Sequence, residues 1–290
     1  MSRARDWTTL VARSLFSSTG RDVDELDRTD AAVRAAVTTS RRLALVSLHG
    51  GTGTTTTAAA VAATTAHRRA GRVLAVDVAA GPAGLAARLG VPPEARRPRP
   101  SSVRGTARTS WEATDGLPVV ADDLVVLGLG RAHTPDVAAD SRDWDTEVAP
   151  IARFFEVVVA DWGRREPATD LGAVCADAHA VVLVCRSDRA SVEEAASYVD
   201  ALRTSGRRPA VVVASVDLDR EGRAAADLVA AREGTTIVSL PWDAAATGPD
   251  GSSGRELTAS SRSAHTALAA ALMTGALRDP DTAVAEEARS

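Results

Sequence analysis

The chain has 290 residues, 45% of them hydrophobic, which suits one large α/β domain or two small ones. Its formal net charge of −4 argues against general affinity for nucleic acid, because that affinity rests on a basic surface that neutralises phosphates. All 34 Lys and Arg positions are arginine, so no lysine of the chain can contact a bound phosphate.

Residues 1–40 are predicted to form an N-terminal helical extension and linker. Apolar side chains with helical spacing occur near its start, namely Trp7, Leu10, Val11, Leu15 and Phe16. A helix this short is marginal alone, so its apolar face must pack on something. Three packing partners are alternatives: the chain's own domain, a protein partner, or a membrane that residues 3–16 contact peripherally. No apolar stretch approaches the ~20 residues needed to span a bilayer.

Residues 41–70 predict a strand, a glycine-rich loop and a helix. Residues 42–47 are a short apolar run typical of a buried strand, and residues 55–70 lack glycine and proline, as a long helix does. Glycines in the loop permit positive φ angles and let successive amides point at an anion, beside the partial positive charge of the helix N-terminus. The candidate nucleotide-binding residues are Gly50, Gly51, Thr52, Gly53, Thr54, Thr55 and Thr56.

The charged part of a phosphate-binding loop is absent. Such loops end in Gly-Lys-Ser/Thr, where the lysine contacts the terminal phosphates and the hydroxyl holds Mg²⁺. Here Thr54 stands at the lysine position and Thr55 at the hydroxyl position. A threonine hydroxyl offers a neutral hydrogen bond, which is about half as strong as a charge-assisted one. We therefore expect weak binding of ATP or ADP, or none.

The loop and the segments after it resemble the MinD/ParA family of deviant Walker ATPases. The family's loop reads Lys-Gly-Gly-x-Gly-Lys-Thr-Thr, and His49 replaces its signature lysine. Residues 72–77 end in Asp77, which matches the first of two aspartates in the family's next motif, whereas Ala79 replaces the second. The resemblance implies that His49, Thr54 and Ala79 are degenerate catalytic positions.

Further segments continue the resemblance in order over residues 41–277. Apolar runs at 155–161, 179–185, 209–214 and 237–243 predict strands, and the first of them resembles the Walker B strand. The implied fold class is α/β, a doubly wound and mainly parallel sheet with helices on both faces, in which ligands bind at the carboxyl ends of the strands. We also expect a helix opened by a capping box of Ser191 and Glu194, and a final helix at 260–273.

The resemblance implies ATP or ADP with Mg²⁺ as cofactors. Thr55, Asp77 and Asp161 are the implied metal-binding residues, although Asp161 could equally cap a loop. Cys175 and Cys185 show no CxxC spacing and no secretory signal precedes them, so we expect two buried free thiols in a cytoplasmic protein.

Two functions are consistent with these substitutions. In the first, a catalytically degenerate MinD/ParA-like protein acts as a scaffold or regulator of positioning, partitioning or secretion machinery. In the second, the chain is an active ATPase whose missing charge comes from an arginine or a partner protein. Losing a charged phosphate contact costs about 1.5–3 kcal/mol, and losing a transition-state cation costs about 10³-fold in rate, which favours the first. A dinucleotide site is disfavoured because Thr56 stands at its third glycine position.

Two further segments resemble MinD-like proteins associated with actinobacterial type VII secretion. They are Val-Ala-Asp-Trp-Gly at 159–163 and Arg-Ser-Asp-Arg at 186–189. This likeness implies a protein partner, either an intact MinD/ParA homologue or a secretion component, and a homodimer is a further expected assembly. Residues 278–290 are expected to be an acidic disordered tail.

Overall fold

The computed structural model describes residues 24–79, 81, 83–96, 102–129, 138–220, 226–227, 229–230, 235–246 and 257–278. The expected membrane or partner contact at residues 3–16 lies outside these residues, as do residues 279–290 of the expected tail. No described helix is long and apolar enough to cross a membrane.

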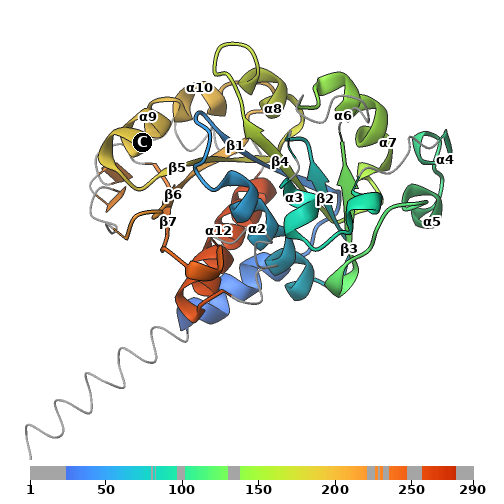
Figure 1. Cartoon of the computed structure of the whole chain (residues 1–290), viewed down its shortest axis with the longest axis horizontal. Coiled ribbons are helices and arrows are strands. Elements are labelled where there is room, and N and C mark those ends of the chain that lie inside the picture. The colour runs from blue at the N-terminus through green and yellow to red at the C-terminus, as the bar shows by residue number, and fades with distance from the viewer. Residues whose placement is uncertain are drawn as a thin grey trace, which may run out of the picture.

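Within the described residues, seven parallel strands form one sheet in the order β3-β2-β4-β1-β5-β6-β7 (Figure 1). The central strands are almost wholly buried, as valine-rich strands of a sheet covered on both faces should be. The expected doubly wound α/β fold is confirmed. The strands are β1 (Arg41–Ser47), β2 (Val73–Asp77), β3 (Leu124–Gly128), β4 (Val157–Arg164), β5 (Ala180–Arg186), β6 (Ala210–Val216) and β7 (Ile237–Leu240).

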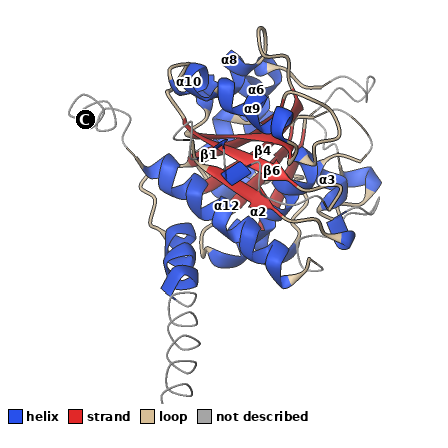
Figure 2. Cartoon of the chain, turned by 90° about the vertical axis from the view of Figure 1, so that its left-hand side faces the viewer, coloured by secondary structure: helices blue, strands red, loops and turns tan. Residues whose placement is uncertain are grey.

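Helices cover both faces of the sheet, with α2 and α12 together on one face and α8, α9 and α10 on the other (Figure 2). Two apolar clusters, one on each face, form the core. The helices are α2 (Thr54–Arg68), α3 (Leu85–Arg88), α4 (Ser102–Gly105), α5 (Ser110–Ala113), α6 (Ser141–Glu147), α7 (Ala149–Ala152), α8 (Leu171–Asp177), α9 (Arg189–Ser197), α10 (Val199–Arg203) and α12 (Ala259–Leu277), with 3₁₀ turns η1 (Pro93–Ala95), η2 (Ala121–Asp123) and η3 (Ala244–Ala246).

Strand β4 contains a bulge where it pairs with β1. Asp161 pairs with Leu45, but the next residue of β1 pairs with Gly163, so Trp162 is the extra residue. Gly163 has a φ of 62°, and a Cβ atom there would lie 2.8 Å from the Cβ of Ala79. The bulge therefore requires glycine at this position, and it fixes the backbone directly after Asp161.

Residues 24–34 form a helix that packs against the end of α2. Val33 has no exposed surface and joins the core cluster on the α2 face of the sheet. Asp30 pairs with Arg68, and the Arg69 guanidinium donates to the Val33 carbonyl at 2.6 Å. This part of the expected extension is thus attached to the domain by both apolar and ionic contacts.

Two local expectations differ from the structure. The α9 helix begins at Arg189, and its cap is Asp188, whose carboxylate accepts from the Ser191 amide at 3.0 Å. The expected capping box is therefore wrong, because an aspartate three residues before Ser191 already provides the cap. Strand β3 was not expected at all, although its residues Leu124–Gly128 are an apolar run at the edge of the sheet.

His179 generates a prediction about pH. Its Nδ1 accepts from the Arg42 amide at 3.1 Å, and burial, reinforced by neighbouring arginines, lowers its pKa to about 4. A histidine whose folded-state pKa lies below its unfolded value near 6.5 stabilises the fold above that value, and the stabilisation is lost as pH falls from about 6.5 to 4.

We expect His179→Asn, whose amide oxygen can still accept from Arg42, to reduce this acid destabilisation by about 2 kcal/mol. Urea unfolding at several pH values between 4 and 7 measures the change in slope. His67→Asn is the control, because the His67 side chain is 71% exposed. An unchanged pH slope in His179→Asn would contradict the assignment.

Candidate functional site

The glycine-rich loop leaves β1 at Ser47 and enters α2 at Thr54, at the carboxyl edge of the sheet. Gly51 and Gly53 adopt φ angles of 73° and 87°, which other residues rarely adopt. Among the described residues, no acceptor is found for the backbone amides from Gly50 to Thr56. A run of amides without acceptors at a helix N-terminus is suited to an anion, so the backbone half of a phosphate site is present.

Thr54, at the position of the missing lysine, is turned into the protein. Its side chain is buried at 5% exposure, and its hydroxyl lies 3.0 Å from the hydroxyl of Thr52, which is buried as well. Each hydroxyl is thus the hydrogen-bond partner of the other. The side chain of Thr54 therefore contacts another residue of the loop, whereas a lysine at this position would extend toward the terminal phosphates.

Asp161 lies at the centre of this edge with no exposed surface. One oxygen, Oδ1, accepts from the Gly163 amide at 3.0 Å, which is the loop-capping role considered for it. The other, Oδ2, is buried and has no hydrogen-bond partner among the described residues. Burial raises the pKa of the carboxyl to about 6, although the Thr55 hydroxyl, the Gly163 amide and two arginines oppose this shift.

Asp77 pairs in register with Asp161 on the adjacent strand, so both predicted metal residues lie at one sheet edge. The Asp77 Oδ2 atom accepts from the Ala86 amide at 3.1 Å and thereby holds the start of α3. A Cβ atom at Gly84 would lie 2.3 Å from that oxygen, so a glycine is needed for this approach. Ala79 lies against Gly163 and offers no side-chain oxygen to the site.

His49 contacts its own chain. Its Nε2 lies 2.8 Å from a carboxylate oxygen of Glu194 on α9. Both residues line a cavity of about 130 Å³ beside the loop, with Cys185 among the other lining residues. Both cysteines are buried and free, as expected, and burial raises the pKa of Cys185 to about 12.

Arg88 and Arg165 are residues of this site that the sequence did not reveal. Arg165 donates to the carbonyls of Trp162, Val78 and Ala139 and stacks on the Trp162 ring at 5.2 Å. Arg88 is the last residue of α3, and burial lowers the pKa of its guanidinium while the charge of Asp161 opposes this shift. Its only sequence signal is an arginine in the otherwise apolar run Leu-Ala-Ala-Arg shortly after Asp77.

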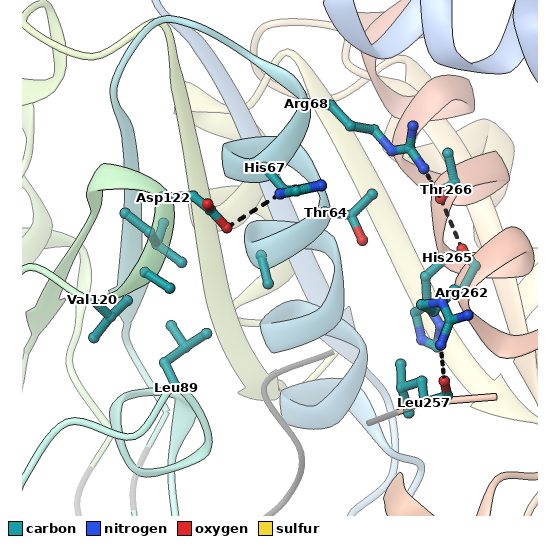
Figure 3. A pocket seen from close by; sticks show the side chains of 13 residues that line it. Thr64, His67, Arg68, Leu89, Val120, Asp122, Leu257, Arg262, His265 and Thr266 are labelled. Atoms are coloured by element: carbon teal, nitrogen blue, oxygen red, sulfur yellow. Dashed lines mark hydrogen bonds and ion pairs between the residues drawn. The ribbon is translucent and has the colours of Figure 1, made fainter. Parts of the chain in front are cut away.

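A second cavity, of about 320 Å³, lies away from the loop and contains none of the expected site residues (Figure 3). It follows the outer side of α2 between η2 and the first turns of α12. The cationic side chains around it have partners: His67 with Asp122, Arg68 with Asp30, and Arg262 with the Leu257 carbonyl. The cavity therefore does not add a cation to the nucleotide site.

These residues fit a phosphate better than a divalent cation. The amides from Gly50 to Thr56 match the acceptor oxygens of a phosphate, because they have no acceptor in the described protein. Of the three implied metal residues, Asp77 supports α3, and Asp161 accepts from the Gly163 amide and lies in the positive potential of Arg165 and Arg88. Thr55 keeps the hydroxyl that would hold Mg²⁺, so one element of a metal site remains.

Comparison with known proteins identifies a relative by sequence. No family model matches the chain. The chain is 30% identical over 259 residues to the ESX-1 secretion-associated protein EspI of Mycobacterium tuberculosis. That alignment covers 82% of this chain but 37% of EspI, so the chain spans little more than a third of that relative's length.

Solved structures share the fold of this chain. The septum site-determining protein MinD of Pyrococcus horikoshii, complexed with Mg-ADP, aligns with a TM-score of 0.61 and 18% identity, over 79% of this chain and 94% of that one. A ParA family ATPase of Chlorobium tepidum aligns with a TM-score of 0.55 and 17% identity, over 79% and 98%. The resemblance seen in the sequence is thus confirmed at the level of structure: the chain has the fold of the MinD/ParA P-loop ATPases.

Proposed function

We propose that this chain is a catalytically degenerate MinD/ParA-like protein that acts as a scaffold or regulator of secretion machinery and binds nucleotide phosphate weakly. The observation that carries the proposal is the buried pair of Thr52 and Thr54 hydroxyls in place of the lysine. It is supported by Ala79, which supplies no carboxylate where the family's second aspartate would orient the attacking water. The amides support binding, whereas the side chains do not support hydrolysis.

The relation to EspI supports a role in type VII secretion. EspI is described as ESX-1 secretion-associated, and its similarity to this chain extends over most of the chain's length. We therefore propose a protein partner, either a secretion component or an intact MinD/ParA homologue, and a cytoplasmic location with peripheral membrane contact through residues 3–16.

The alternative is an active ATPase whose missing charge is supplied by an arginine. One observation favours it, namely the electrostatic attraction between Arg88 and Asp161, which opposes the lowering of the Arg88 pKa by burial. A guanidinium replaces charge but supplies no base or water-orienting carboxylate at position 79. This alternative therefore accounts for binding more readily than for turnover.

We expect purified protein to hydrolyse ATP no faster than a no-enzyme control. The loss of one transition-state cation costs about 10³-fold in rate, and here both lysines and the second aspartate are missing. Phosphate release with Mg²⁺ is the measurement, and an intact MinD protein is the positive control. A Mg²⁺-dependent turnover that disappears in Asp161→Ala would refute catalytic degeneracy.

ATP should also fail to switch dimerisation. The family's signature lysine reaches across a nucleotide-bound dimer, but His49 is shorter and pairs with Glu194 of its own chain. Any dimer should therefore be constitutive, or be a heterodimer in which an intact homologue contributes the lysine. Sedimentation velocity with and without ATP and Mg²⁺ measures this, and an ATP-induced shift of the isolated protein would count against it.

A further inference from the structure

We propose that the cavity between α2, η2 and α12 binds an uncharged small molecule that has a ring-sized apolar body and a hydroxyl or N–H donor. None of the residues of the glycine-rich loop lines this cavity. The site is therefore separate from the phosphate site, and its ligand goes beyond the proposed function.

The cavity has the size and the walls of a small-molecule site. Its volume of about 320 Å³ lies at the lower end of the range of about 300–1,000 Å³ that is typical of ligand pockets. Leu89, Leu124 and Leu257 line it, and each of them is at most 5% exposed. Buried leucines beside an unfilled space lack dispersion contacts on that side, and an apolar ligand body would supply them.

His265 places a hydrogen-bond acceptor in the cavity. This residue of α12 is 6% exposed, and its Nδ1 atom lies 2.8 Å from the Ser261 carbonyl oxygen. Because a carbonyl only accepts, Nδ1 carries the ring proton, and burial lowers the pKa of His265, so the ring is neutral at pH 7. Nε2, at the far end of the ring, then has a lone pair and no partner among the described residues. A donor on a ligand would satisfy this buried acceptor.

A second polar group lies across the cavity from this nitrogen. Thr64 on α2 faces His265 on α12 (Figure 3). Threonine hydroxyls within a helix often donate to the carbonyl four residues earlier, as Thr65 does to Val61 at 2.7 Å. The Thr64 hydroxyl makes no such bond to the described residues. It is therefore available to donate to the oxygen of a ligand hydroxyl whose own proton is donated to His265.

The charges around the cavity favour a neutral ligand. A carboxylate ligand would place its oxygens against the lone pair of His265, which repels them. An ammonium ligand would need a carboxylate partner, and the only carboxylate among the described lining residues is that of Asp122. Asp122 already lies 3.4 Å from His67, so a cation would lose its hydration without gaining a free counter-ion.

NMR titration of the full chain with phenol and fluorobenzene tests the inference. The two molecules have nearly the same shape, but only phenol has a donor. We expect phenol to bind with a Kd of about 1 mM and fluorobenzene to bind about fivefold or more weakly, as for the loss of one neutral hydrogen bond. Indole, which has an N–H donor, should also bind more tightly than fluorobenzene, and benzoate should bind more weakly than phenol.

Two variants assign the binding to this cavity. His265→Phe keeps a ring but removes the acceptor, so phenol affinity should fall to that of fluorobenzene, whose own affinity should change by less than about twofold. Ala63→Phe fills the cavity from α2 and should weaken both ligands about tenfold or more. Ala201→Phe is the matched control, because Ala201 is exposed on α10, on the opposite face of the sheet, and it should bind like wild type.

Thermal unfolding of each variant confirms that it is folded, and the comparison of phenol with fluorobenzene on the wild-type chain does not depend on any variant. Equal affinity for these two ligands, tighter binding of benzoate than of phenol, or no binding of phenol would each overturn the inference. So would undiminished phenol affinity in His265→Phe or in a folded Ala63→Phe. All of these measurements are made without nucleotide, so their outcome is independent of phosphate binding and hydrolysis.

Discussion

The buried carboxylate of Asp161 is the constraint on which the arrangement around the loop depends. A carboxylate without exposed surface must be hydrogen-bonded or paired with a positive charge, since the protein interior solvates an ion poorly. The bulge in β4 brings the Gly163 amide to one of its oxygens, and two arginines supply positive potential. The backbone after Asp161 and the charges around it thus together accommodate a carboxylate in the protein interior.

The fold was predictable because its signals are local. The strands β1, β2, β4, β5 and β6 are apolar runs flanked by polar or turn residues, and such runs alternate with helical stretches in the chain. Strand β3 was missed because its apolar run is only five residues long. It also follows directly after two aspartates, Asp122 and Asp123, which both adopt left-handed backbone angles. The start of α9 was misplaced because Asp188 and Ser191, three residues apart, are both good caps, and sequence alone does not choose between them.

The residues of the candidate site were likewise predictable where the signal is local in the sequence, and not predictable elsewhere. The loop is contiguous in sequence, so its amides and its missing lysines were visible without a structure, and Asp77 and Asp161 were placed by the rule that parallel strands end at one edge. The roles of Arg88 and Glu194 were not visible. Both depend on how α3 and α9 pack against the sheet, which brings their side chains to residues far away in the chain.

Helix α2 connects the helix at residues 24–34 with the glycine-rich loop. The helix at residues 24–34 contacts Arg68, the last residue of α2, and Arg69 directly after it, while the first turn of α2 forms the end of the loop. With 15 residues, α2 is a continuous rod about 22 Å long. The contacts with residues 24–34 and the amides of the loop therefore lie at opposite ends of one continuous helix.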